Sequence, residues 1–147
     1  MRVAIIGLPM SGKTTLFDAL TGAREQPGGY AAPGPVQLGI VHVEDARLAA
    51  AVEVVKPKKV TRAGIEVVDI GGLFAGEKPT AEALESLRTA DGFVKVVRAF
   101  SSAAVPPLKG SVNGRRDLEE IDSDLFIADL DIIERAIERL RVSVKKP

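Results

Sequence analysis

The chain has 147 residues, the length of one domain, and its 20 Lys and Arg balance its 20 Asp and Glu. A hydrophobic share of 46% with 27% charged residues excludes general disorder, and the zero net charge argues against a dedicated nucleic-acid wrapper. With no cysteine and one histidine, the sequence excludes disulfides, cysteine zinc sites, thiol nucleophiles and a His-rich metal site.

The first predicted element is a short, fully apolar strand at residues 3–6, followed by a Gly/Pro/Ser loop at 7–12 and a helix from Lys13 to Leu20. The apolar run at the start is too short for a signal peptide. No stretch reaches the roughly 18 apolar residues that a membrane helix needs. We therefore expect a cytoplasmic protein with no membrane partner.

Apolar periodicity and turn residues predict the remaining elements. We expect a loop at 24–35, where three Pro and three Gly interrupt the chain, and a linker at 101–116. The expected strands are 36–43, 65–70 and 93–97, and the expected helices are 46–55 after an Asp45 cap, 81–89 after a Thr80 cap, and 118–144. Alternating strands and helices favour an α/β fold with a mostly parallel sheet joined by right-handed crossovers.

The long predicted helix carries two apolar stripes. One begins at Leu118 and Ile121, and the other runs from Phe126 to Val144 with 4-3-4 spacing. A helix with two stripes contacts two surfaces, for example its own domain and a partner helix. Docking of the whole helix in one core is the open alternative.

Residues 7–14, Gly-Leu-Pro-Met-Ser-Gly-Lys-Thr, match the P-loop pattern G-x-x-x-x-G-K-[ST] between a strand and a helix. The glycines let successive backbone N–H groups turn inward around phosphate oxygens, and the helix N-terminus adds positive charge. We expect Lys13 to bridge the β- and γ-phosphates and the Thr14 hydroxyl to bind Mg²⁺. The predicted nucleotide-binding residues of the loop are Pro9, Met10, Ser11, Gly12, Lys13, Thr14 and Thr15.

Asp69 and Gly72 follow the strand at 65–70. An acid at the carboxyl end of a strand near a P-loop can hold Mg²⁺, usually through water, and the Gly72 N–H can reach a γ-phosphate. The alternative is that Asp69 caps a turn that Gly72 permits. Beside the P-loop, we interpret Asp69 with Thr14 as the metal site and Gly72 as a nucleotide contact.

The order of several motifs resembles the Obg-like (YchF-type) P-loop GTPase/ATPase family. These motifs lie at residues 7–17, 45–48, 55–57, 65–73, 91, 96–100 and 122–136. The resemblance implies a three-layer G domain of the TRAFAC/Obg type, a nucleotide switch of the translation-factor kind, and association of the full-length protein with the ribosome and its RNA. It also implies that the last helix leads toward a coiled coil, so we divide the chain into a partial nucleotide-binding domain at 1–116 and the start of a helical insertion at 117–147.

The chain departs from the family pattern at several positions. The family's Asn-Val before Gly-Lys is Met10-Ser11 here, which a loop that works through its backbone tolerates. Pro33 falls where the first switch offers a threonine, and the second switch is shortened after residues 76–78. Leu73 stands where Ras-like enzymes carry a water-orienting glutamine, so hydrolysis is expected to be slow, and no catalytic residue is assigned.

The motif that distinguishes GTP from ATP is missing, because Asn113 to Asp117 has the wrong spacing and is interpreted as a turn. In the family this motif lies beyond the coiled coil, so we expect the chain to be a fragment. The sequence leaves open GTP or ATP, hydrolysis or a binding module without catalysis, and, less favoured, a small-molecule kinase. We also expect self-association through the strand edge at 93–97 or the stripe at 126–144.

Overall fold

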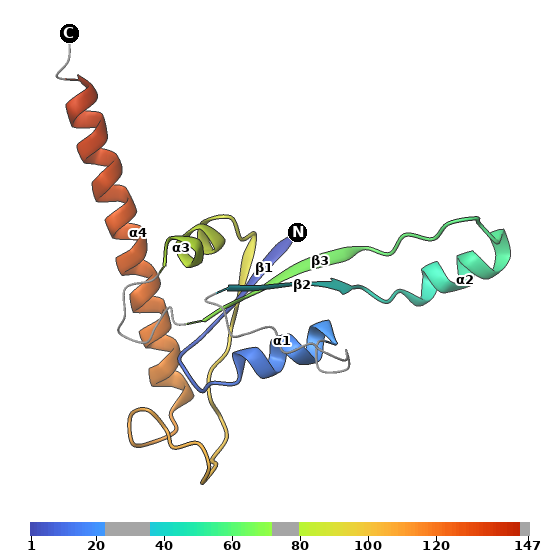
Figure 1. Cartoon of the computed structure of the whole chain (residues 1–147), viewed down its shortest axis with the longest axis horizontal. Coiled ribbons are helices and arrows are strands. Elements are labelled where there is room, and N and C mark those ends of the chain that lie inside the picture. The colour runs from blue at the N-terminus through green and yellow to red at the C-terminus, as the bar shows by residue number, and fades with distance from the viewer. Residues whose placement is uncertain (23–35, 72–79, 145–147) are drawn as a thin grey trace.

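The computed structural model describes residues 1–22, 36–71 and 80–144. Its four strands form one sheet in the order β2-β3-β1-β4, and β1 pairs in parallel with both β3 and β4 (Figure 1). Their bounds are β1 (Arg2–Ile6), β2 (Val36–His42), β3 (Gly64–Ile70) and β4 (Gly92–Lys95). The expected strands are therefore confirmed to within a few residues, and β4 lies at one end of the sheet.

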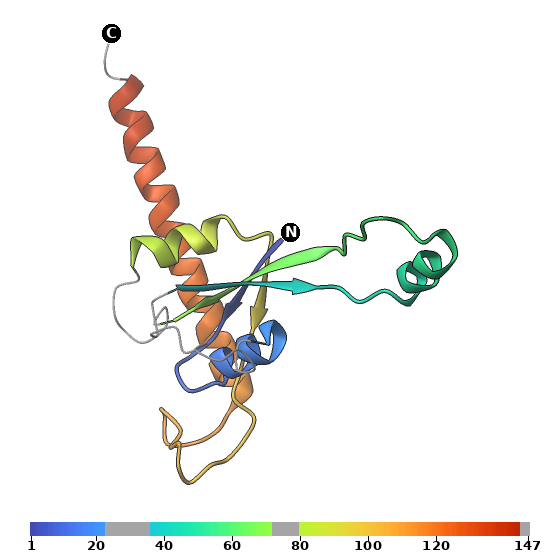
Figure 2. The same ribbon diagram turned by 45° about the vertical axis from the view of Figure 1, so that its right-hand side comes forward.

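One expected connection is wrong. β2 and β3 are antiparallel, with Val36 opposite Ile70 and His42 opposite Gly64, so no right-handed crossover joins them. The intervening helix, α2 (Ala46–Val55), buries no residue and lies at the far end of a long β2–β3 ribbon (Figures 1 and 2). A crossover helix must present an apolar face to the sheet. The Ala- and Val-rich α2 lies beyond the end of the sheet instead.

The other helices are α1 (Lys13–Thr21), α3 (Ala81–Arg88) and α4 (Gly114–Val144). The two predicted caps are present. The Asp45 carboxylate accepts from the Arg47 N–H at 2.8 Å, and the Thr80 hydroxyl oxygen accepts from the Ala83 N–H at 3.2 Å. Such caps satisfy N–H groups that the first turn of a helix leaves without a partner.

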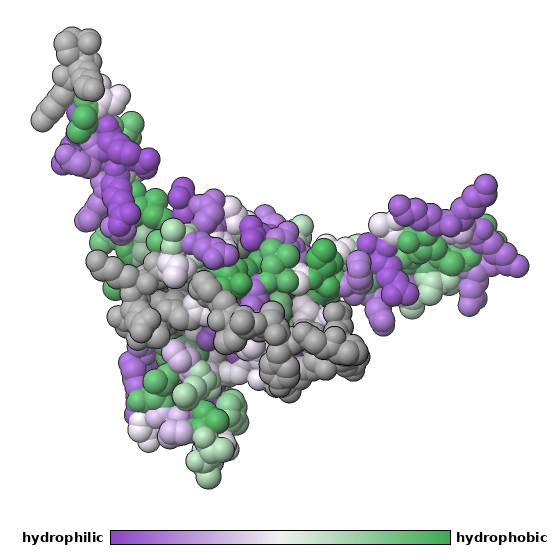
Figure 3. Space-filling model, in the orientation of Figure 1, coloured by the Kyte–Doolittle hydropathy of each residue, from purple (hydrophilic) through white to green (hydrophobic). Residues whose placement is uncertain are grey.

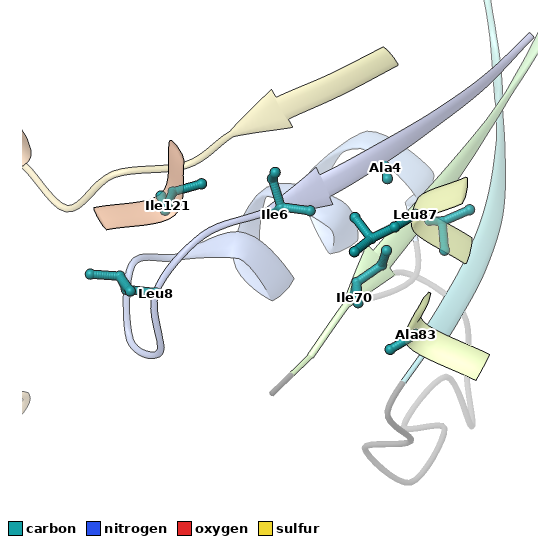
Figure 4. Packing of buried hydrophobic residues seen from close by; sticks show 8 residues of the cluster. Ala4, Ile6, Leu8, Ile70, Ala83, Leu87 and Ile121 are labelled. Carbon is teal, nitrogen blue, oxygen red and sulfur yellow. The ribbon is translucent and has the colours of Figure 1, made fainter. Parts of the chain in front are cut away.

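The sheet separates two buried clusters, which gives the expected three layers. Alternation along β1 sends Ile5 to the α1 side, where it packs with Phe17 and Val67. It sends Ala4 and Ile6 to the opposite side, which α3 and the start of α4 cover (Figure 4). The second cluster consists of Ala4, Ile6, Leu8, Val68, Ile70, Ala83, Leu87 and Ile121.

Helix α4 begins four residues earlier than predicted. The Asn113 side-chain oxygen accepts from the Arg116 N–H at 3.1 Å, so residues 113–117 form a capped helix start, and the predicted turn there is wrong. Ile121 is fully buried and Leu125 packs beside it, whereas the remainder of α4 extends away from the sheet (Figure 1). Ile121 and Leu125 of the first stripe thus dock on the domain, whereas Leu118 of the same stripe is exposed. Phe126, Leu130 and Ile133 of the second stripe are exposed.

Candidate functional site

The P-loop connects the end of β1 to α1 and depends on two unusual backbone conformations. Met10 has φ 61° and Gly12 has φ 101°, both left-handed, and Gly12 caps α1 without a side-chain hydrogen bond. The first turn of α1 contains no acid, so nothing on it offsets the positive end of the helix dipole. These features leave backbone donors and positive potential at a helix N-terminus, the arrangement that binds phosphate.

Gly7 begins the loop directly against Val96, the residue that follows β4. A Cβ atom placed on Gly7 would lie 2.2 Å from the Val96 carbonyl oxygen and 3.0 Å from the Ser11 hydroxyl oxygen. Ser11 is itself buried, and its hydroxyl has no hydrogen-bond partner among the described residues. Glycine at this position therefore allows the loop to pack tightly on the neighbouring strand.

Lys13 lies in the first turn of α1 with its side chain folded over the loop. Its ammonium group donates to the Leu8 carbonyl oxygen at 3.0 Å. Burial lowers the pKa of Lys13 from its ordinary value of 10.5, and the negative charge of Asp69 acts in the opposite direction. A buried ammonium group whose hydrogen bond within the described residues is to one carbonyl oxygen is suited to exchange that contact for phosphate oxygens.

Thr14 and Asp69 meet although they lie 55 residues apart in the sequence. The Thr14 hydroxyl donates to Asp69 Oδ2 at 2.7 Å, because β3 runs parallel to β1 and places Asp69 opposite Ile5. Asp69 is buried, and its Oδ1 has no hydrogen-bond partner in the described part of the chain. The structure thus brings these two side chains together, and their role in binding a metal stays a prediction.

The donor set at this point fits Mg²⁺, which prefers oxygen ligands and keeps several waters. The fit rests on the unpartnered Asp69 Oδ1 beside the Thr14 hydroxyl. Within residues 1–22, 36–71 and 80–144, no cluster of three or more acidic, His or Cys side chains could hold a metal by itself. Phosphate oxygens and water would have to complete the coordination.

The other predicted site residues divide into two groups. Met10, Thr14 and Thr15 are exposed and Pro9 is partly exposed, so this side of the loop is accessible. Gly72, Pro33 and Leu73 lie outside the described residues. β2 begins at Val36 and β3 ends at Ile70, and these two residues are paired. They lie at the end of the sheet where β1 leads into the P-loop.

Sequence reasoning missed the support that residues 97–117 give to the P-loop. Arg98 is buried, its guanidinium donates to the carbonyl oxygens of Phe100, Val105 and Pro106, and it stacks 4.6 Å from the Phe100 ring centroid. The segment that it organises closes a small cavity against Leu8, Pro9 and Ser11. The available signals were an arginine after a strand and its place in the motif at 96–100. Neither reveals partners that are backbone oxygens.

The fold and the loop together define a class of protein. A parallel β1–β3 pair, a glycine-bounded loop at the N-terminus of α1, and Lys13 and Thr14 beside Asp69 are the features of a P-loop nucleotide-binding protein. A family model described as 50S ribosome-binding GTPase matches residues 2–140. The chain belongs to this family.

Within the family, the similarity is to the YchF and Obg-like proteins, as the motif order indicated. The chain is 38% identical over 149 residues to the ribosome-binding ATPase YchF of Pasteurella multocida and 34% identical over 151 residues to that of Bacillus subtilis. It is 32% identical over 154 residues to Obg-like ATPase 1 of Oryza sativa subsp. indica. These alignments cover 98–99% of this chain and 38–41% of the relatives.

A solved structure supports the same assignment. The Schizosaccharomyces pombe YchF GTPase matches with a TM-score of 0.71 and 32% identity, and the alignment covers all of this chain and 40% of that one. The chain therefore spans about two fifths of the length of the proteins that it matches. The expected G-domain fold is confirmed. No helix among the described residues has both the length and the apolar character needed to cross a membrane.

Proposed function

We infer that this chain binds a purine nucleoside triphosphate, GTP or ATP, together with Mg²⁺. The observation that carries the proposal is the convergence of Lys13, Thr14 and Asp69 at the N-terminus of α1. The backbone of residues 9–15, through the N–H groups from Met10 onward, and the Lys13 ammonium would hold the phosphates. Thr14 would bind the metal, with Asp69 acting through water, and Gly72 is proposed as a γ-phosphate contact.

The bound metal would supply charge neutralisation between the β- and γ-phosphates. The chain's own residues would do the positioning. The Lys13 ammonium would exchange its hydrogen bond with the Leu8 carbonyl oxygen for bonds to the phosphates. Asp69 would orient the Thr14 hydroxyl, which already donates a hydrogen bond to it. Hydrolysis, where it occurs, is proposed to be slow.

We further propose a switch role. The segments before Val36 and after Gly71 join β2 and β3 at the end of the sheet where β1 leads into the P-loop. A γ-phosphate bound there could bias their conformation. The names of the relatives, ribosome-binding ATPases, support ribosome association as the output, and with it a cytoplasmic location. We also propose that residues 117–147 form the start of a helical insertion, whose residue Ile121 packs in the domain core.

The test is a titration of fluorescent GTP and ATP analogues against the wild type and Lys13→Ala, with and without Mg²⁺. We expect Lys13→Ala to weaken binding at least about a hundredfold, since it removes a charged phosphate contact. Arg88→Ala, an exposed arginine on α3, is the matched control and should bind like the wild type. Equal affinity of Lys13→Ala and the wild type would reject the proposal.

Phosphate release separates the switch from its alternative, a binding module without catalysis. Nucleotide binding with Mg²⁺-dependent release above that of buffer supports a slow enzyme. Binding without release supports the module.

A further inference from the structure

The second functional candidate lies at the end of the β2–β3 ribbon. We name residues 43–63 the arm. The Val43 N–H donates to the Ala63 carbonyl oxygen at 2.9 Å, which extends the ribbon pairing one step beyond the strands. Beyond that bond the chain forms α2 and a stretch without regular structure at 56–63. The arm projects away from the P-loop and from both buried clusters (Figures 1 and 2).

The arm does little for the stability of the fold. Helix α2 buries no residue, and every residue from 53 to 64 is exposed. Val54 is 84% exposed and Val55 is 72% exposed. A projecting element that buries so little apolar surface gains little from the hydrophobic effect, so its sequence is free to serve contacts with another molecule.

The arm also carries a net positive charge in a neutral chain. Its five cations and three carboxylates give it a net charge of +2, whereas the whole chain has zero. Four of the five cations lie close together in the sequence. Residues 54–65 hold Lys56, Lys58, Lys59 and Arg62 and no acid.

These four cations have no ion-pair partner among the described residues. Four exposed arginines elsewhere on the helices do have one. Arg88, Arg115, Arg135 and Arg141 each lie within 4.0 Å of a glutamate or aspartate one turn away. Arg47, the remaining cation of the arm, is likewise held by Asp45 at 2.9 Å. The arm thus presents four unpaired positive charges on one short segment.

The four cations lie within a short length of chain, which suits a polyanion whose negative charges are closely and regularly spaced. From Lys56 to Arg62 the backbone reaches at most about 20 Å, because an extended chain spans at most about 3.3–3.6 Å per residue. Lys59 and Arg62 also line a groove of about 1160 Å³ beneath α2, whose apolar floor includes Leu48, Val52 and Val60. Figure 3 shows this hydrophobic patch between hydrophilic surfaces. The three acids of the arm, Glu44, Asp45 and Glu53, also line this groove but lie outside the 54–65 segment.

We propose that Lys56, Lys58, Lys59 and Arg62 of the arm bind the phosphate backbone of RNA, at a site separate from the nucleotide site. A nucleic-acid backbone offers phosphates at short, repeated intervals, and unpaired lysines and arginines bind it without reading sequence. This inference deepens the proposed ribosome association by assigning the RNA contact to one segment. The alternative occupant, an acidic polypeptide, is tested below.

The experiment uses the whole chain and two variants of equal charge. The arm variant is Lys56→Gln, Lys58→Gln, Lys59→Gln and Arg62→Gln. The control variant replaces Arg88, Arg115, Arg135 and Arg141 with Gln. It also removes four positive charges, but from positions that are ion-paired. Fluorescence anisotropy of a labelled 30-nucleotide RNA hairpin, at 50 to 200 mM KCl, measures affinity and its salt dependence.

We expect the arm variant to bind RNA at least about tenfold more weakly at 100 mM KCl and its log–log salt slope to fall by about 3, as four lost phosphate contacts require. The control variant should change affinity by less than about threefold. Equal losses in the two variants would overturn the proposal. It would equally be overturned if labelled polyglutamate bound as tightly as the RNA and with the same dependence on the arm.

Nucleotide affinity distinguishes a failure of this inference from a failure of the proposed function. The arm variant should bind GTP or ATP analogues like the wild type, since the arm lies away from the P-loop (Figure 1). Lys13→Ala should keep its RNA affinity. RNA binding that depends on the arm in a chain that binds no nucleotide would support the arm and reject only the nucleotide site.

Discussion

At the scale of single residues, Met10 adopts a backbone conformation in the P-loop that its residue type disfavours. Its φ of 61° is left-handed, a conformation that costs an L-residue roughly 1–2 kcal/mol, and its side chain is more than half exposed. The YchF-type pattern has Asn at this position. Asn tolerates the left-handed region because its short polar side chain bonds to the local backbone. The chain therefore carries strain in the loop that Asn at position 10 would relieve.

We predict that Met10→Asn stabilises the protein by about 0.5–1 kcal/mol, the part of the strain that Asn relieves. Urea unfolding at equilibrium, read by circular dichroism, measures the change. Met10→Ala is the matched control and should not stabilise, since alanine meets the same steric conflict. A lower urea midpoint for Met10→Asn than for the wild type would contradict the prediction.

The residues of the site were predictable to different degrees. Lys13 and Thr14 followed from the motif because their spacing fixes their place in the first turn of α1. Asp69 followed from the rule that parallel strands end at one edge. The Lys13 contact with the Leu8 carbonyl oxygen and the carbonyl partners of Arg98 were not predictable. Backbone oxygens leave no trace in the sequence.

At the scale of elements, α4 shows how one helix serves two environments. Its early turns hold Asp117 and Ile121, both buried, and its later turns expose Phe126 and Leu130. The two stripes were visible in the sequence. The point at which the helix leaves the domain was not, because the apolar spacing is the same on both sides of it.

We predict that Ile121→Ala destabilises the protein by about 2–4 kcal/mol, as expected for a large-to-small change at a fully buried site. Ile133→Ala, in the same helix at a position about half exposed, should cost less than about 1 kcal/mol. Thermal and urea unfolding of the pair give the comparison. Similar costs at the two positions would mean that the docking of α4 differs from the structure described above.

The direction of β2 relative to β3 was predicted wrongly because it depends on how whole elements pair. A helix between two strands favours a crossover, and α2 has the length and composition for one. The antiparallel pairing of Gly39 with Val67 and of its neighbours determines the outcome instead. Strand direction depends on partners distant in sequence, which periodicity alone does not encode.

At the scale of the whole molecule, both sheet edges and one helix face lack a partner within the described chain. β4 pairs only with β1 and β2 only with β3, and the later turns of α4 form an apolar face. Open edges and apolar faces both favour association. The self-association expected from the sequence remains a prediction.

We predict a concentration-dependent dimer, measured by sedimentation velocity between about 5 and 200 μM, the range in which interfaces of modest size form. Phe126→Glu with Ile133→Glu should give a monomer if the α4 face mediates contact, and Val94→Lys should do so if the β4 edge does. Arg139→Glu is the charge control on α4 and should leave the dimer intact. A wild type that remains monomeric at the highest concentration would contradict both routes.

The docking of α4 has a mechanical consequence. Ile121 is packed in the cluster that contains Leu8, the residue that precedes the phosphate loop's Pro9, while Val144 lies about 35 Å further along the helix at 1.5 Å per residue. A pivot of about 10° at Ile121 would displace the far end by about 6 Å on that geometry. The long helix is thus a lever arm with its short end seated beside the site where triphosphate is proposed to bind.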